Sequence, residues 1–130
     1  MRIAGALLLA ALLCASGAGQ KKPKPPDVQV LDVSARRADG KIFVDGRVRN
    51  TGEKPIRRLS MVVDFLASGR SPIASKKSPI EEDLLDVGDE ADFHGEIVDP
   101  VRAVEYSLRA FDGSGRDLVA GNTGPFPILE

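Results

Sequence analysis

The sequence predicts an all-β domain built from two face-to-face sheets, and three observations support this prediction. In residues 27–130, apolar and polar residues alternate with a period close to two, which is typical of half-buried strands rather than of helices. Clusters of Gly, Pro and Asp interrupt the alternation roughly every ten residues, as turns do between short strands. Cys14 is the only cysteine and Trp is absent, so the core is expected to form without a disulfide and mainly from aliphatic side chains.

Residues 1–19 have the order of a secretory signal peptide. Arg2 precedes an apolar run over residues 3–13 and then the small-residue stretch CASGAG. The apolar run is too short to span a bilayer. Lipidation of Cys14 is the alternative, but bulky Leu13 stands where lipoprotein signals have a small residue. We therefore expect an exported protein, periplasmic or secreted, with lipoprotein anchoring through Cys14 disfavoured.

Residues 20–26, QKKPKPP, are predicted to be a linker. Three prolines and three lysines favour an extended, solvated segment. Three lysines are fewer than a convincing lipid-binding patch contains, so membrane contact is expected at most through this linker. Residues 27–130, about 100 residues, suit a single domain.

Seven strands are predicted, each with one apolar face. Their ranges are 28–35, 41–49, 58–67, a short element at 72–77, then 90–97, 104–111 and a loose last strand at 117–128. The side chains expected to point inward are Ile42, Val44, Gly46, Val48, Leu59, Met61, Val63, Phe65, Ala91, Phe93, Gly95, Ile97, Val104, Tyr106, Leu108 and Ala110. Pro125 and Pro127 mark the last strand as an edge, because neither can donate to a ladder. Residues 78–86 are consistent with either a strand end or a single helical turn.

The stretch NTGEKP, residues 50–55, stops the alternation for longer than a tight hairpin needs. Because Pro55 also removes a ladder donor, this segment is expected to carry the chain from one sheet to the other. The short, glycine-rich DGSGR, residues 112–116, instead predicts a hairpin within one sheet. Seven strands with such a crossing predict an immunoglobulin-like sandwich. Tyr106 follows a proline-containing corner and is interpreted as a tyrosine that bonds back to the backbone there.

Charge is divided unevenly along the chain. Residues 21–77 contain 14 basic and 6 acidic residues, whereas residues 78–130 contain 3 basic and 13 acidic residues. A basic half can indicate nucleic-acid binding. Pairing of the second and fifth predicted strands, however, would bring Arg47 and Arg49 close to Asp92 and Glu96. We therefore expect the asymmetry to be neutralised within the molecule, with no nucleic-acid partner.

The sequence predicts no catalytic, cofactor-binding or metal-ligating residue, and no cofactor. It contains no G-x-S-x-G elbow, phosphate-binding glycine loop or HExxH helix. His94 is the only histidine and is expected to face solvent, and one imidazole without a second ligand makes a poor zinc site. The acidic stretch EEDLLDVGDEAD lacks the spacing of a calcium-binding loop.

The run VDGRVRNTGEKPIRRLSMVVDFLASGR, followed by LLDVGDEADF, resembles the FxLYD-type bacterial extracytoplasmic domains. Their pattern is a strand ending in Gly-x-Val-x-Asn, a polar turn, an alternating strand with an aromatic residue and a glycine turn, and Leu-x-x-Gly-Glu before a Phe. The matching residues are Gly46, Val48, Asn50, Phe65, Gly69, Leu85, Gly88 and Phe93. The resemblance covers about half of the chain, and Leu66-Ala67 follows Phe65 where the family has Tyr-Asp. It implies an immunoglobulin-like envelope module with no assigned catalytic residues.

Two function classes follow from the sequence. The first is a non-catalytic exported module for protein binding or envelope assembly, with a protein of the cell envelope as partner. Its candidate contact surface is the outer face of the third strand, where Val62 and Leu66 lie outside the inward pattern, unless the first strand, the short element or the tail covers them. The alternative is a hydrolase or metal-dependent enzyme with an unrecognised site, which would need titratable groups that converge in a pocket.

Overall fold

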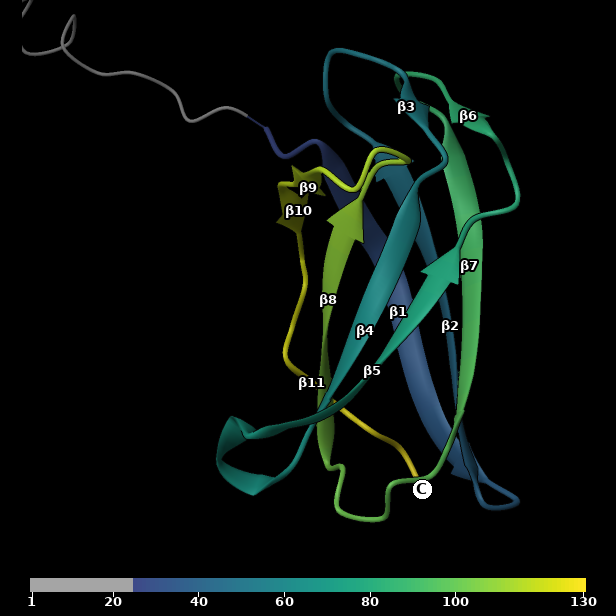
Figure 1. The fold of residues 1–130 in the computed structure, drawn as a ribbon. Coiled ribbons are helices and arrows are strands. Elements are labelled where there is room, and N and C mark those ends of the chain that lie inside the picture. Colours follow the sequence, from purple (N-terminus) through teal and green to yellow (C-terminus); the bar gives the residue numbers. More distant parts are fainter. Residues whose placement is uncertain (1–24) are drawn as a thin grey trace, which may run out of the picture.

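The computed structural model describes residues 25–130, which form two β-sheets packed face to face (Figure 1). The strands are β1 (Val28–Ala38), β2 (Lys41–Asn50), β3 (Ile56–Arg57), β4 (Ser60–Leu66), β5 (Pro72–Pro79), β6 (Leu84–Leu85), β7 (Glu90–Val98), β8 (Glu105–Phe111), β9 (Asp117–Leu118), β10 (Ala120–Gly121) and β11 (Phe126–Pro127), with a 3₁₀ turn η1 (Ser68–Arg70) after β4. The predicted all-β class is confirmed. The predicted signal peptide and most of the linker lie outside the described residues. Nowhere in residues 25–130 is there a helix with the length and apolar character needed to cross a membrane.

The two sheets have the strand orders β10-β1-β2-β7 and β11-β8-β4-β5, with β9 also paired to β8. Neighbouring strands in both sheets are antiparallel except β1 and β10, which are parallel. β3 and β6 form a separate short ladder. The order corresponds to an immunoglobulin-like sandwich in which the short element β5 pairs with β4 rather than with β7. The ambiguous residues 78–86 contribute the strand β6.

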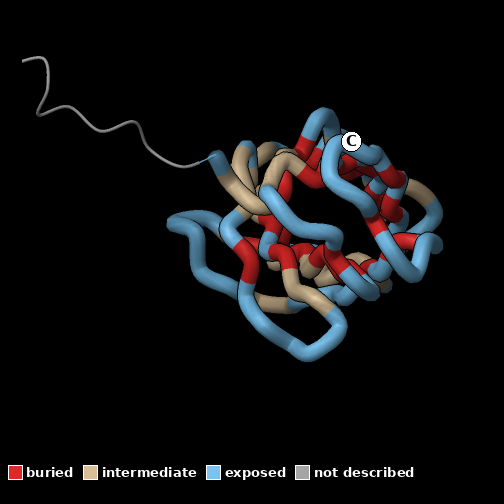
Figure 2. The backbone as a smooth tube through the Cα atoms, turned by 90° about the horizontal axis from the view of Figure 1, so that it is seen from above, coloured by how far each residue is buried: buried red, intermediate tan, exposed pale blue. Residues whose placement is uncertain are grey.

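The core lies between the sheets, where the backbone of both carries buried residues (Figure 2). It consists mainly of alternate aliphatic side chains. The predicted inward residues that are fully or almost fully buried are Ile42, Val44, Val48, Leu59, Met61, Val63, Phe65, Ala91, Phe93, Tyr106, Leu108 and Ala110. Each large one among them contributes roughly 1.5–3 kcal/mol through burial. The prediction was wrong for Val104, which is 44% exposed. Val104 precedes the first residue of β8, so it does not follow the alternation of that strand.

Gly46 lets β7 pack closely on β2. It lies opposite Phe93 in the ladder, and a Cβ atom at Gly46 would lie 2.4 Å from the Phe93 ring. Since the Phe93 side chain is fully buried, no free space exists into which the ring could move. A glycine at this position therefore makes room for the largest core side chain of β7.

Asn50 ends β2 and fixes the crossing between the sheets. It is 1% exposed, and its Nδ2 donates to the carbonyls of Lys54 and Leu85 at 2.9 Å each, while its Oδ1 accepts from the Gly52 N–H at 3.0 Å. A buried amide costs free energy unless it is hydrogen-bonded, and this one is bonded at both ends. The alternation stops at Asn50 because this side chain holds the arch and β6 together. The predicted crossing is confirmed, since β2 and β4 belong to different sheets.

The two long sides of the sandwich differ. On the closed side, between β1 and β8, residues 117–130 pair alternately with both sheets: β9 and β11 with β8, and β10 and Leu129 with β1. On the open side, between β5 and β7, no strand of residues 25–130 pairs with either outer edge (Figure 1). The sheets approach each other there, because a Cβ atom added at Gly95 would meet Ser78 Oγ at 2.4 Å.

Candidate functional site

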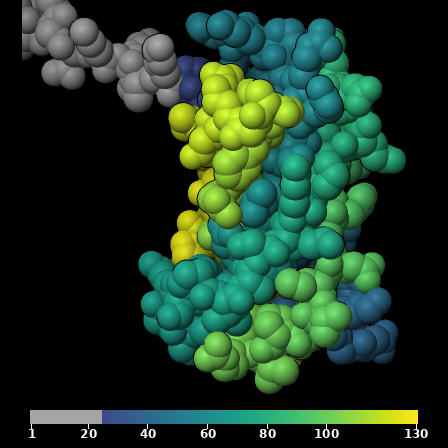
Figure 3. All heavy atoms as spheres, viewed as in Figure 1, coloured from purple at the N-terminus to yellow at the C-terminus, as the bar shows by residue number. Residues whose placement is uncertain are grey.

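An open groove of about 860 Å³ lies on the outer face of the β4, β5 and β8 sheet. Residues from β4 and β5 form its floor, and the β8–β9 hairpin and the segment before β6 form its walls. Its lining residues are Arg58, Leu59, Ser60, Val62, Lys77, Pro79, Ile80, Glu82, Asp83, Phe111, Asp112, Gly113, Ser114 and Gly115. In the space-filling view, the yellow-green hairpin lies beside the teal surface of β4 and β5 (Figure 3).

The groove combines apolar side chains with two cations. Val62 and Phe111 are half-buried, so part of each side chain is accessible from solvent. Arg58 and Lys77 are exposed, and neither forms an ion pair with another residue of the described chain. The groove also contains the exposed carboxylates Glu82 and Asp83, so it offers an apolar contact area together with charged side chains of both signs.

The backbone at Arg58 is held in an unusual conformation. Its φ of 47° lies in the left-handed region, which is unfavourable for residues with a Cβ atom. Two hydrogen bonds of 2.8 Å hold the segment, from Arg58 N–H to the Asp83 carbonyl and from Gly113 N–H to the Arg57 carbonyl. These bonds join the two walls of the groove through the Arg57–Arg58 pair.

The hairpin wall is stabilised by Asp112. Its Oδ1 accepts hydrogen bonds from the N–H groups of Ser114 (2.9 Å) and Arg116 (3.0 Å), and from the Ser114 hydroxyl. These bonds, led by the Ser114 hydroxyl, lower the pKa of Asp112 to about 2. The predicted hairpin at residues 112–116 is confirmed, with the Asp112 carboxylate bonded to its own turn.

Below the groove, the same face carries an ordered polar cluster. Arg109 donates from Nε and Nη2 to the two oxygens of Asp64 at 2.7 and 2.9 Å, and Ser75 Oγ donates to Asp64 Oδ1 at 2.7 Å. The Arg109 guanidinium also lies 5.4 Å from the centre of the Phe111 ring. This cluster links β4, β5 and β8, and so gives the floor of the groove a fixed shape.

Of the two residues expected to form a contact surface, the structure brings only Val62 to the groove. Leu66 is 8% exposed, so it offers almost no area to a partner. The ladder between β4 and β5 shifts register between Phe65 and Leu66, so Leu66 lies where the regular strand pairing ends. Arg58 and Phe111 belong to the groove but were not predicted from the sequence, where the Arg57–Arg58 pair was the only signal.

His94 lies outside the groove, on the outer face of β7. It is exposed, and its Nδ1 is 2.5 Å from Asp45 Oδ1 on β2. The hydrogen bond to Asp45 raises the pKa of His94 above its ordinary value. Within residues 25–130, no three His, Cys, Asp or Glu side chains come close enough to form a metal site.

The charge asymmetry of the sequence is partly matched between β2 and β7. Arg47 forms ion pairs with Asp92 at 3.0 Å and Glu90 at 3.1 Å, which confirms the predicted contact for this arginine. The prediction was wrong for Arg49, which lies opposite Glu90 and forms no ion pair within the described chain. Glu96 lies opposite Phe43 instead and binds Lys41 at 2.9 Å.

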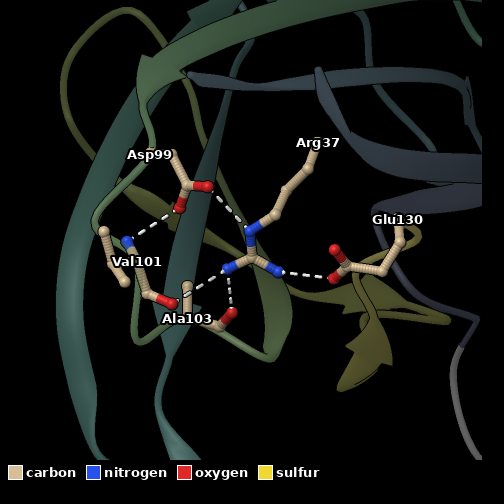
Figure 4. Close-up of polar contacts among 5 residues, drawn as sticks. All are labelled: Arg37, Asp99, Val101, Ala103 and Glu130. Atoms are coloured by element: carbon tan, nitrogen blue, oxygen red, sulfur yellow. Dashed lines mark hydrogen bonds and ion pairs between the residues drawn. The ribbon is translucent and has the colours of Figure 1, made fainter. Parts of the chain in front are cut away.

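Arg37 fixes the corner between β7 and β8 (Figure 4). Its Nε donates to Asp99 Oδ2 at 2.8 Å, Nη1 donates to Glu130 at 3.0 Å, and Nη2 donates to the carbonyls of Ala103 and Val101. Val101 is held with φ at 68°, while its N–H donates to Asp99 Oδ1 at 2.7 Å. The hydrogen bond from Arg37, followed by that from the Val101 N–H, lowers the pKa of Asp99 below its ordinary range.

The interpretation of Tyr106 as the residue that holds this corner was wrong. Tyr106 is 1% exposed, and its ring packs against Phe126 with the ring centres 5.5 Å apart. Burial raises the pKa of Tyr106 to about 12. Arg37 takes the predicted role of Tyr106, and sequence pattern gave no signal for it because its partners are 62 or more residues away.

Comparison with known proteins gives similarity in architecture only. The sequence matches no family model, and no curated protein matches it, so the resemblance to FxLYD-type domains stays a prediction. The chain is similar to IrmA from Escherichia coli, with a TM-score of 0.48 and 9% identity over 82% of this chain and 100% of that one. It is similar to the Pseudomonas fluorescens alkylpurine DNA glycosylase AlkC (TM-score 0.44, 15% identity, 80% of this chain and 31% of that one). It is also similar to the Bordetella pertussis ApaA protein (TM-score 0.44, 16% identity, 78% and 98%). Similarity at this level carries no functional argument.

Proposed function

We propose that this chain is a non-catalytic exported module that binds a protein of the cell envelope through the groove on β4, β5 and β8. The observation that carries the proposal is the lining of the groove. Half-buried Val62 and Phe111 line it together with Arg58 and Lys77, two cations without an ion-pair partner in the described chain, and with the carboxylates Glu82 and Asp83. Aromatic and arginine side chains around an apolar centre are typical of residues that dominate binding between proteins.

The backbone conformation of Arg58 supports the same interpretation. A residue with a Cβ atom in the left-handed region costs about 1 kcal/mol or more, and such strain is retained mainly where the surrounding structure enforces it. Here the two hydrogen bonds at Arg57 and Arg58 enforce it. The result is an exposed guanidinium at the groove, where a partner can reach it.

One carboxylate of the groove, Asp112, and the only histidine of the chain are poorly placed to act as a general base there. A general base must be able to reach and take a proton from a substrate. Asp112 is bonded to its own hairpin, with its pKa lowered to about 2, which makes it a weak base. His94 lies on the other sheet and is not among the residues that line the groove. The exported location within this proposal depends on the sequence of residues 1–19.

Site-directed photo-cross-linking in the producing cell tests the proposal. A photoreactive phenylalanine analogue in place of Phe111 is expected to capture a partner protein. The same analogue in place of Val119 should capture none, because Val119 is 67% exposed but outside the groove. If both positions give the same cross-linked products, the groove has no specific partner.

Val62→Glu provides the matching loss of function. Val62 lies opposite Lys77 and Arg109, so a glutamate there gains two cationic neighbours and the domain should still fold. The added charge in the apolar centre of the groove is expected to abolish cross-linking from position 111. Val119→Glu, the same substitution on an exposed loop, should leave cross-linking from position 111 unchanged. Cross-linking that persists in the Val62→Glu variant would exclude this groove as the contact surface.

A further inference from the structure

The open side of the sandwich leaves two strand edges unpaired. Within residues 25–130, β7 is the last strand of one sheet and β5 is the last strand of the other. An unpaired edge presents a row of N–H and C=O groups that can bind another extended chain. The corresponding edges on the closed side, β1 and β8, already pair with residues 117–130.

The edge strand β7 is acidic on its outer face. Charges alternate in sign across the sheet, because Asp32 lies opposite Arg47 and Arg47 lies opposite Asp92. Glu90, Asp92 and Glu96 each use one carboxylate oxygen in an ion pair with β2, while the other oxygen has no partner in the described chain. A strand added beyond β7 would continue the alternation if it carried basic side chains.

The edge strand β5 has the opposite charge. Lys76 and Lys77 are exposed, and neither forms an ion pair with a residue of the described chain. Pro72 and Pro79 stand at the two ends of β5, so residues 73–78 between them keep their N–H groups. Both lysines line one open hollow of about 460 Å³ together with Glu96 and other residues of β2 and β7. The basic edge and the acidic edge therefore border the same side of the molecule.

The two edge strands run in opposite directions. β7 runs with β1, because both are antiparallel to β2, and β5 runs with β8, because both are antiparallel to β4. β8 is antiparallel to β11, and the chain after β11 forms a parallel bridge to β1 through Leu129. β5 is therefore antiparallel to β7 (Figure 1). Consider a second copy related by a two-fold axis that runs parallel to the strands beside the open side. It would place β7 of the first copy antiparallel to β5 of the second, and β5 of the first copy antiparallel to β7 of the second.

We propose that the open side is a homodimer interface in which β7 of each copy pairs with β5 of the other. The arrangement is closed and self-complementary, and it continues both sheets across the dimer. It places the carboxylates on the outer face of β7 against Lys77 of β5 twice, while Lys76 lies on the inner side, near Gly95. Pairing of β7 with β7, or of β5 with β5, would set like charges against each other. The charges that keep like edges apart thus select this one arrangement. It shares Lys77 with the proposed binding groove, but the dimer does not require that the groove bind a partner.

Sedimentation equilibrium of the protein expressed from the whole 130-residue sequence tests the dimer. A dimer is expected that weakens as the salt concentration rises. Reversal of both lysines, Lys76→Glu with Lys77→Glu, should weaken the dimer about tenfold or more. Arg36→Glu with Lys54→Glu makes the same change in net charge away from the open side and should leave the dimer unchanged. Phe111→Ala, which alters the groove on β8 and lies opposite neither lysine, should also leave the dimer unchanged.

Charge reversal on the other edge gives an independent test. The double variant Asp92→Lys with Glu96→Lys should be a monomer when no other variant is present. If the double variant does not fold, the single variant Glu96→Lys replaces it. Mixed with the lysine-reversed variant, it should form a heterodimer, because every β7–β5 contact then has opposite charges again. A wild-type chain that stays monomeric, a dimer that persists after lysine reversal, or folded reversed variants that do not associate when mixed would each overturn the proposal.

Discussion

The closed and open sides of the sandwich each contain the edge strands of both sheets, but these edges are protected differently. On the closed side, residues 117–130 cover the edges of β1 and β8 and bury Leu118 and Ile128. On the open side, the edges of β5 and β7 carry lysines, prolines and carboxylates. A covered edge therefore uses apolar side chains, and an uncovered one uses charge, which matches how strand edges avoid non-specific association.

The closed side should depend on the anchoring of its last residues. Ile128→Ala is expected to lower the free energy of unfolding by about 2 to 4 kcal/mol, because Ile128 is 7% exposed and packs in the core. Urea unfolding measures the change. Leu129→Ala is the control: Leu129 is 54% exposed, and its backbone pairing with β1 survives the substitution, so a change within about 0.5 kcal/mol is expected. Equal effects of the two substitutions would show that Ile128 does not anchor the segment.

The open side should depend on the close approach of Gly95 and Ser78. Gly95→Ala is expected to lower the free energy of unfolding by about 1 to 3 kcal/mol, because the new Cβ atom would meet Ser78 Oγ at 2.4 Å. Ser78→Ala alone should be close to neutral, because this buried hydroxyl has no hydrogen-bond partner within the described chain. The double variant should recover much of the loss, and a double-mutant cycle measures the coupling. Additive effects would contradict the proposed contact.

Arg37→Met tests the hydrogen bonds that hold the corner between β7 and β8. Loss of the guanidinium leaves Asp99 and two carbonyls without their donor, and is expected to cost about 1 to 2 kcal/mol near pH 7. Arg36→Met, the same change at an exposed neighbour, should cost much less.

The cost of Arg37→Met should also depend on pH. The pKa of Asp99 is lower in the folded protein than its ordinary value, so its contribution is complete above about pH 4 and is lost as the pH falls through the folded value. The stability difference between the wild type and the Arg37→Met variant should therefore become smaller in acid, leaving the part due to the two carbonyls. A difference that stays constant down to about pH 2 would show that Asp99 does not carry the effect.

The smallest effect is expected at Val101, in the same corner. Its φ of 68° is strained for a β-branched residue. Val101→Gly should therefore raise the free energy of unfolding slightly, by up to about 1 kcal/mol. Val98→Gly, at an exposed strand position without positive φ, should instead lower stability by about 0.5 to 1 kcal/mol. A destabilised Val101→Gly variant would mean that side-chain contacts of Val101 outweigh its backbone strain.

Much of the fold could be predicted from the sequence because it depends on local alternation. The inward sets in β2, β4 and β8 were identified correctly, apart from Val104, which lies outside its strand. The interruption at Asn50 indicated the crossing, although the reason for it, a buried amide bonded to Lys54 and Leu85, became visible only in the structure.

The candidate site was less predictable. Val62 was predicted as a contact residue because it is an apolar residue on the outer face of an alternating strand, and the same pattern included Leu66, which is buried. Alternation assigns a face to a residue but does not say what covers that face. Arg58 and Phe111 are 53 positions apart in the sequence, and only the hydrogen bonds between the Arg57–Arg58 segment and the hairpin at Gly113 bring them to one groove.

The sequence by itself determined where the long strands lie, which of their faces turn inward, and where the chain changes sheets, because these depend on patterns a few residues long. The tertiary structure decided how residues 117–130 divide between the two sheets, which residue holds the β7–β8 corner, and which edges stay unpaired. Those outcomes depend on distances between segments far apart in the chain. Such distances are set by packing between the two sheets, which no local pattern encodes.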